Sequence, residues 1–228
     1  MDYNLFKKYV KKGNNDRKEM LLDLFSNEYI KVQEFINGTN IIIGDINTSK
    51  KALCAHYDTK IEGYGAYDNC GGVFSLLELY KKDYETKPLL IFTDKEEVEQ
   101  SGAKNFLKKY GQELSNQIKE IIVIDCVGIG MNILGANYAK FSSDYRTDSH
   151  EFIDFGFNST HLFTVDKKSK KELCGGQIPK YLASLMHTKE DSADKVSAES
   201  IENFVDTIYN YLIGGEPKWD NLENTILN

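Results

Sequence analysis

The sequence predicts an α/β fold with a mixed, mostly parallel central sheet sandwiched between helices. Four short and almost continuous apolar runs support this fold class: Ile41–Ile43, Ala52–Ala55, Leu89–Phe92 and Ile121–Ile124. Strands that are buried on both faces, as in a parallel sheet, have this pattern. Segments with a helical spacing of apolar residues separate the runs, and alternating strands and helices are typical of an α/β sandwich.

We expect helices at both ends of the chain and between the strands. The stretch over about residues 1–35 is predicted to be helical, with Asp16 as a candidate cap of its second helix. Four apolar residues share one face of its first helix: Leu5, Phe6, Tyr9 and Val10. Further helices are expected at Cys70–Tyr80, Ser101–Tyr110 and Ala198–Leu212, whereas Lys167–Lys171 is expected to be a solvated loop.

The length of 228 residues and the absence of repeats, low-complexity tracts and Pro- or Gly-rich linkers favour one domain over residues 1–228. Within it we expect N-terminal helices at about 1–35, a catalytic core at about 40–213 and a short C-terminal tail. Four cysteines without a CxxC pair, in a chain with no secretory-type apolar stretch, predict free thiols and a cytoplasmic protein.

Charge and hydropathy indicate which partners to expect. The net charge is −7, from 35 acidic and 28 basic residues, and no basic stripe offsets it, so we expect neither a nucleic-acid nor a membrane partner. No window approaches the roughly 18 apolar residues that span a bilayer. The oligomeric state stays open.

Polar side chains that can bind metal ions follow three of the apolar runs. They are, in chain order, His56 with Asp58, Glu96 with Glu97, and Asp125. Two further candidates are Asp68, just before the helix at residues 70–80, and His187, in a loop ahead of the last helix. Because sites in such sheets form beyond the carboxyl ends of the strands, we expect these side chains to converge.

The chemistry of this set favours a metal centre. Converging carboxylates repel one another and raise each other's pKa unless a cation neutralises them. Imidazole and carboxylate ligands suit zinc and also accept manganese or cobalt. Two ions about 3.5–4 Å apart need a bridging carboxylate. If the segment of Glu96 and Glu97 is extended, the two side chains point in different directions, so one can bind metal while the other acts as general base.

The whole pattern resembles the two-zinc aminopeptidases typified by bacterial leucyl aminopeptidases, which share a fold with glutaminyl cyclases and glutamate carboxypeptidases. Five segments carry the resemblance, in the expected order: residues 54–59 (CAHYDT), 65–72 (GAYDNCGG), 94–102 (DKEEVEQSG), 124–128 (IDCVG) and 187–191 (HTKED). The segment DSHEF at residues 148–152 is similar to a family pocket motif with its residue order changed.

The resemblance implies a centre with two Zn²⁺ ions per chain. His56 and Asp125 would bind the first ion, Glu97 and His187 would bind the second, and Asp68 would bridge them. The implied activity is removal of the N-terminal residue from short peptides that have a free N-terminus.

The resemblance also implies roles around the ions. Glu96 would be the general base, and Asp58 would orient the ring of His56. In several relatives the peptide bond after the bridging aspartate is cis, and we expect the same at Asp68–Asn69, although a cis non-proline bond costs about 3–4 kcal/mol.

Several alternatives remain at this point. A glutaminyl cyclase with one zinc, an N-acyl amino acid deacylase or a carboxypeptidase would use the same fold, and a non-catalytic binding module is the rival from another class. Asp191 is as consistent with a turn residue as with a site residue. Substrate-binding residues are not predicted, because Glu99, Gln100 and Asp148–His150 depart from the family pattern.

Overall fold

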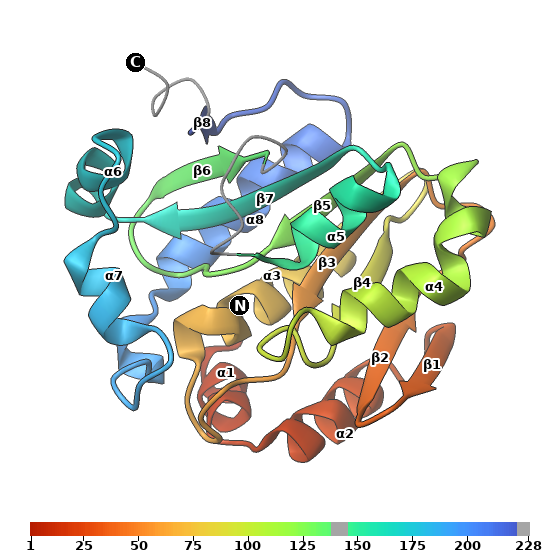
Figure 1. Cartoon of the computed structure of the whole chain (residues 1–228), viewed down its shortest axis with the longest axis horizontal. Helices are drawn as coiled ribbons and strands as arrows, with labels where there is room; N and C mark the ends of the chain where they lie inside the picture. The colour runs from red at the N-terminus through yellow and green to blue at the C-terminus, as the bar shows by residue number, and fades with distance from the viewer. Residues whose placement is uncertain (138–145, 223–228) are drawn as a thin grey trace.

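A single eight-stranded mixed sheet forms the centre of the molecule (Figure 1). The computed structural model describes residues 1–137 and 146–222. The strands are β1 (Ile30–Phe35), β2 (Gly38–Ile43), β3 (Lys51–His56), β4 (Leu89–Thr93), β5 (Glu120–Ile124), β6 (Asn132–Ala136), β7 (Ser159–Val165) and β8 (Asp220–Asn221). Their order across the sheet is β1-β2-β4-β3-β5-β7-β6-β8.

The strands that the sequence predicted form the middle of this sheet. β3 pairs in parallel with β4 and β5, and β5 pairs in parallel with β7. The outer pairs β1–β2, β2–β4 and β6–β7 are antiparallel, and β8 runs parallel to β6. The predicted fold class, a mixed and mostly parallel sheet between helices, is therefore confirmed.

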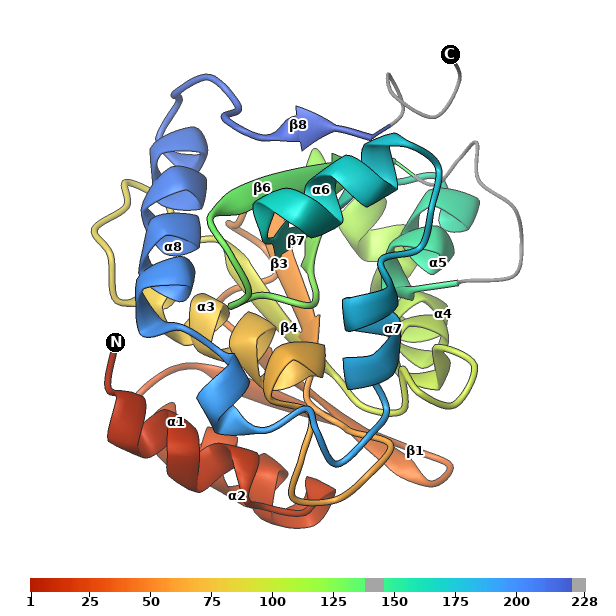
Figure 2. The ribbon, with the colours of Figure 1, turned by 90° about the vertical axis from the view of Figure 1, so that its left-hand side faces the viewer.

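Helices cover both faces of the sheet, as Figures 1 and 2 show. One layer consists of α1 (Tyr3–Val10), α2 (Asn14–Leu24), α3 (Gly71–Tyr80) and α8 (Ala198–Leu212). The other consists of α4 (Ser101–Ser115) and α5 (Asp148–Phe155). The shorter helices α6 (Lys167–Cys174) and α7 (Lys180–Leu185) lie at the side that faces the viewer in Figure 2.

Side chains of β3 point alternately into two separate hydrophobic cores, one on each face of the sheet. Leu53 and Ala55 face the core under α3 and α8, whereas Ala52 and Cys54 face the core under α4 and α5. Complete burial of a large apolar side chain contributes roughly 1.5–3 kcal/mol. Packing therefore holds β3 from both faces, and it also holds the backbone of His56, the last residue of the strand.

The N-terminal helical stretch is shorter than the sequence predicted. Residues 30–35 form β1 instead of helix, in a hairpin whose turn contains Asn37 at a φ of 65°. The two loop residues are Ile36 and Asn37, and Asn is one of the residues that tolerates a positive φ, so Asn37 followed by Gly38 at the start of β2 did indicate a turn here. The cap of α2 is Gly13, and Asp16 lies in the first helical turn, where its charge favours the helix dipole.

Two other segments refine the expectations. Lys167–Lys171 lies in α6, not in a loop, because the side chain of Asp166 accepts hydrogen bonds from the amides of Lys168 and Ser169 and caps the helix. The described part of the C-terminal tail packs on the body of the molecule: the Trp219 ring lies 4.9 Å from that of Tyr211. Residues 223–228 of the tail lie outside the described part of the chain.

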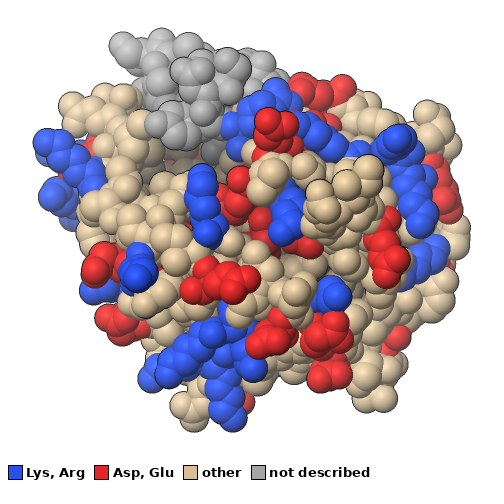
Figure 3. All heavy atoms as spheres, turned by 60° about the horizontal axis from the view of Figure 1, so that its bottom comes forward, with Lys and Arg blue, Asp and Glu red and all other residues tan. Residues whose placement is uncertain are grey.

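The surface is mixed in charge. On the side that lies at the bottom of Figure 1, Lys and Arg side chains alternate with Asp and Glu (Figure 3). Within the described ranges, no helix combines the length and the apolar character that crossing a bilayer requires.

Candidate metal centre

The predicted metal-binding residues gather where the central parallel strands end. His56 is the last residue of β3 and lies opposite Thr93, the last residue of β4. Asp125 directly follows β5. Asp68 lies in the segment Ala66–Cys70, between β3 and α3, and His187 follows α7. Three neighbouring strand ends and two loops thus build one site.

Asp68 lies between two groups of ligand atoms. The Nε2 atom of His56 is 3.2 Å from Oδ1 of Asp68 and 3.4 Å from Oδ1 of Asp125. On the other side, Nε2 of His187 is 3.2 Å from Oδ2 of Asp68 and 3.0 Å from Oε2 of Glu97. Within each triad the ligand atoms lie within 4.8 Å of one another. The two triads share one carboxylate, and each of its oxygens faces a different triad.

The donor set fits two divalent ions. Nε2 of His56, Oδ1 of Asp125 and Oε1 of Glu97 are buried and have no hydrogen-bond partner among the described residues. Buried polar atoms without partners are costly, so their convergence points to a cation between them. Two imidazoles and three carboxylates are ligands that zinc, manganese and cobalt accept.

The electrostatics of the cluster show how strongly it favours positive charge. Burial alone would lower the pKa of His56, but neighbouring carboxylates, first among them Asp125, raise the pKa well above its usual value. Hydrogen bonds with Asp68 and Glu97 raise the pKa of His187 to about 10. Burial opposes ionisation of Asp68, yet the imidazoles of His187 and His56 lower the pKa of its carboxyl group below the usual value.

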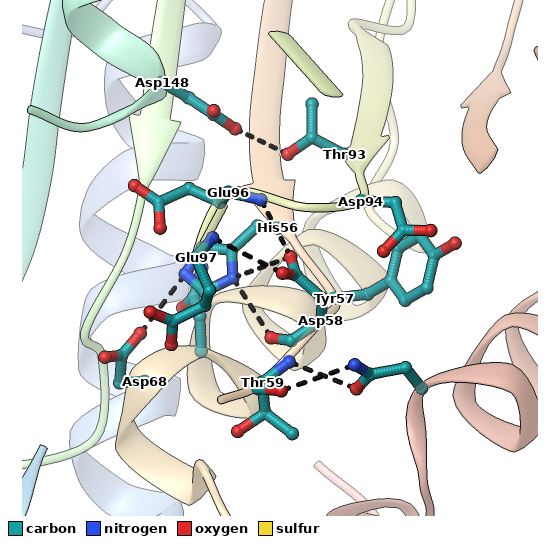
Figure 4. A network of polar contacts seen from close by, with 12 residues as sticks. His56, Tyr57, Asp58, Thr59, Asp68, Thr93, Asp94, Glu96, Glu97 and Asp148 are labelled. Carbon is teal, nitrogen blue, oxygen red and sulfur yellow. Dashed lines mark hydrogen bonds and ion pairs between the residues drawn. The ribbon is translucent and has the colours of Figure 1, made fainter. Parts of the chain in front are cut away.

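Glu96 and Glu97 diverge because the chain turns here, whereas the sequence predicted an extended segment. Lys95 and Gln100 have φ angles of 63° and 52°, and residues 96–100 form turns. The amide of Glu96 donates to Oδ1 of Asp58 at 3.1 Å, and that of Glu97 donates to Oδ2 at 3.4 Å. Figure 4 shows the result: the carboxylate of Glu97 points toward the ligand cluster and that of Glu96 leaves in another direction.

Asp58 therefore contacts both the histidine and the glutamate turn. Its Oδ1 atom is 3.4 Å from Nδ1 of His56, and its carbonyl oxygen is 3.2 Å from the same nitrogen. Contacts to Nδ1 leave Nε2 of the ring directed at Asp68 and Asp125, which is the geometry expected of a residue that orients a metal-binding histidine.

The loop around Asp68 is held by residues whose roles the sequence did not reveal. The peptide bond Asp68–Asn69 is cis, as predicted. Asn69 ties this loop to the end of β5, because its side-chain amide donates to the Ile124 carbonyl at 2.9 Å. The carboxylate of Asp191 accepts hydrogen bonds from the amides of Tyr67 and Asp68 at 2.7 and 3.0 Å.

Asp191 is consequently a site residue and not only a turn residue. Its side chain is buried, and its backbone carbonyl also accepts from the amides of Gly65 and Ala66. Burial raises the pKa of Asp191 to about 6. The one indication of this role in the sequence was the position of Asp191, four residues after His187 and inside the fifth matching segment.

A second buried carboxylate, Asp148, lies behind Glu96. The Thr93 hydroxyl donates to its Oδ2 atom at 2.5 Å, and burial raises the pKa of Asp148 to about 7. Glu96 is partly buried, and this burial, with the charges of Asp148 and Asp125 adding to it, raises its pKa well above the usual value. A carboxylate that readily holds a proton thus lies beside the ligand cluster.

A cleft of about 610 Å³ opens onto these residues. Asp68, Glu96, Glu97, Asp125 and His187 line its floor. Its walls include Cys126 and Met186, whose sulfur atoms are 3.8 Å apart, and the rim carries basic side chains. The site is therefore accessible to a ligand the size of a short peptide.

The sequence comparisons agree with this site. Residues 42–140 match the model of peptidase family M28. That stretch contains all the candidate ligands except His187. No curated protein matches the sequence.

Solved structures show the same architecture. The LapA aminopeptidase of Legionella pneumophila is 14% identical, with a TM-score of 0.67 over 95% of this chain and 68% of that one. A glutaminyl cyclase from an Acidobacteriales bacterium is 19% identical, with a TM-score of 0.72 over 92% of each chain. The zinc aminopeptidase BSAP of Bacillus subtilis is 17% identical, with a TM-score of 0.60 over 76% of this chain and 49% of that one.

Fold and sequence match together define the class: the chain has the fold of the M28 metallopeptidases and resembles that family, as its motifs predicted. At these identities the structural likeness establishes the fold. The chain spans about half the length of the Bacillus enzyme.

Proposed function

We propose that the chain is a metal-dependent aminopeptidase, which removes the N-terminal residue from short peptides at a centre of two zinc ions. The observation that carries this proposal is the position of Asp68 between two triads of His and carboxylate ligands. Such a shared carboxylate is what two ions at short distance require.

The residues of the site then take separate tasks. Two bound zinc ions would polarise the substrate carbonyl and lower the pKa of the attacking water. Glu96, whose carboxylate belongs to neither triad, takes the proton of that water and passes it to the leaving amine. Asp58 holds His56 and the amides of both glutamates in place, and Asp191 holds the loop of Asp68.

The matched pair Glu96→Gln and Glu97→Gln tests these assignments. Glu96→Gln should keep both ions and lower kcat by roughly 10²–10⁴-fold, because it removes the base and no ligand. Glu97→Gln should bind less zinc, measurable by elemental analysis after dialysis. Full activity of Glu96→Gln would show that the base is another group.

The reaction itself is tested with a mixed pool of peptides, free and N-acetylated, analysed by mass spectrometry. Loss of the first residue from free peptides only supports the aminopeptidase. Cleavage confined to blocked peptides would replace it with a deacylase.

A glutaminyl cyclase is the second candidate. One observation favours it: the cyclase structure and this chain cover 92% of each other, whereas the two aminopeptidases extend well beyond it. The second triad, with Glu97 and His187, favours the peptidase instead, because a cyclase of the kind considered above uses one zinc. Peptides that begin with glutamine decide between them, since a cyclase converts them to pyroglutamyl products.

A further inference from the structure

Arg17 in α2 is a buried cation near the metal centre. Arg17 is the largest of the fully buried side chains among the described residues, and within that part of the chain it forms no ion pair. Its guanidinium group donates instead to backbone carbonyls: Nη1 to Tyr57 at 3.3 Å, and Nη2 to Val10 at 3.1 Å and to Tyr64. Methionine would fill a similar volume without the cost of burying a charge, so packing alone does not explain an arginine here.

Two of the three carbonyls that Arg17 binds lie at opposite ends of the loop that leads from His56 to Asp68, and the third ends helix α1. Tyr57 directly follows His56. Tyr64 directly precedes the left-handed turn at Gly65 that leads the chain to Asp68. The guanidinium is a rigid planar fork with its donors at fixed spacing. One side chain therefore holds the two ends of this loop, next to His56 and ahead of Asp68, whose ligand atoms must meet.

Other contacts from the same N-terminal helices reach the remaining loop segments. The backbone amide of Thr59 donates to Oδ1 of Asn14 at 3.1 Å, and Nδ2 of Asn14 donates to the Thr59 carbonyl at 3.3 Å. The Tyr3 hydroxyl contacts the carbonyls of Ala193 and Val196 at 2.6 and 2.9 Å, just after Asp191. Helices α1 and α2 thus contact the loop that leads to Asp68 and the segment that follows Asp191.

We propose that α1 and α2, which precede the stretch that matches the family model, are a positioning element of the metal centre, and that Arg17 fixes the loop between His56 and Asp68 and so sets the spacing of these two ligands. This inference rests on the proposed metal centre. Loss of a residue that orients ligands weakens metal affinity by about 10–100-fold. We expect that range for the loss of the Arg17 fork.

Four variants test the proposal: Arg17→Met, Arg17→Lys, Asn14→Ala and the control Leu21→Ala. Leu21 lies in the same helix and is fully buried in the hydrophobic core, but its side chain has no polar atom that could bind a loop carbonyl. Zinc and cobalt affinities are measured by competition with a chelating dye, the cobalt form is followed by its visible absorption spectrum, and unfolding midpoints are measured in chelator.

Arg17→Met should bind cobalt about 10–100-fold more weakly and with an altered spectrum. Arg17→Lys should restore little of this, because a single ammonium nitrogen cannot occupy the two fixed positions of Nη1 and Nη2. Asn14→Ala should weaken binding to a smaller degree. Leu21→Ala should lower the unfolding midpoint but keep the affinity and the spectrum of the original chain.

Wild-type affinity in Arg17→Met or full recovery in Arg17→Lys would overturn the proposal, as would an equal loss of affinity in Leu21→Ala. If Arg17→Met does not fold, Asn14→Ala decides, since unchanged binding in that variant would also overturn it. A wild-type chain that binds no ion would instead refute the proposed function.

Discussion

Replacement of Asp191 by alanine should destabilise the protein although the residue binds no metal in the proposed centre. The change leaves the amides of Tyr67 and Asp68, at 2.7 and 3.0 Å from the carboxylate, without an acceptor. Hydrogen bonds to a charged group contribute about 1.5–3 kcal/mol each, so about 3–6 kcal/mol is at stake. The burial that raises the pKa of Asp191 to about 6 also disappears, which offsets part of the loss. We expect a net loss of about 2–4 kcal/mol.

Urea unfolding of the metal-free protein in chelator at pH 8, followed by circular dichroism, measures this loss. With an m-value of about 2 kcal/mol per M, the midpoint should fall by roughly 1–2 M. The exposed neighbour Asp194 provides the control, and Asp194→Ala should leave the midpoint unchanged. A midpoint in Asp191→Ala equal to that of the control would refute the argument that this carboxylate holds the Asp68 loop.

Two further predictions concern metal binding and the loop. Because the pKa of His187 is raised to about 10, its imidazole is protonated at neutral pH in the metal-free protein, and a metal ion must displace that proton. Zinc affinity should therefore rise with pH and binding should release protons, which calorimetry in buffers of different ionisation enthalpy detects; binding without proton release would contradict this. Gly65→Ala places a Cβ atom 2.5 Å from the Asp68 carbonyl oxygen at a φ of +78°, whereas at Gly176, with a φ of +71°, nothing lies within 4 Å. Gly65→Ala should cost about 1–3 kcal/mol more than Gly176→Ala and weaken zinc binding, and equal unfolding midpoints would contradict the clash.

The parts of the fold that the sequence predicted are those where burial leaves an unbroken apolar run. β3, β4 and β5 are buried on both faces and were recognisable for that reason. β7 was missed, because its buried positions include the polar Ser159 and Thr164, which disguise the strand. β1 was missed because it is an edge strand in which the polar Gln33 is buried and the apolar Val32 is exposed, so no apolar run marks it.

The same distinction separates the predicted from the unpredicted site residues. Side chains that bind metal directly, such as His56 and Asp125, directly follow apolar strands and are chemically conspicuous. Arg17 and Asp191 act on backbone carbonyls and amides that lie far from them in the chain. Such contacts put no constraint on the identity of the partner residue, so they leave no pattern in the sequence.

The order of the ligands along the chain has a consequence for synthesis. The triad of His56, Asp68 and Asp125 is encoded in the earlier part of the chain, but the other triad lacks a member until His187 has been made. A nascent chain that stops before that residue holds one triad at most, and it cannot carry out a reaction that needs both. The proposed activity therefore requires that residue 187 has been made and has folded against the Asp68 loop.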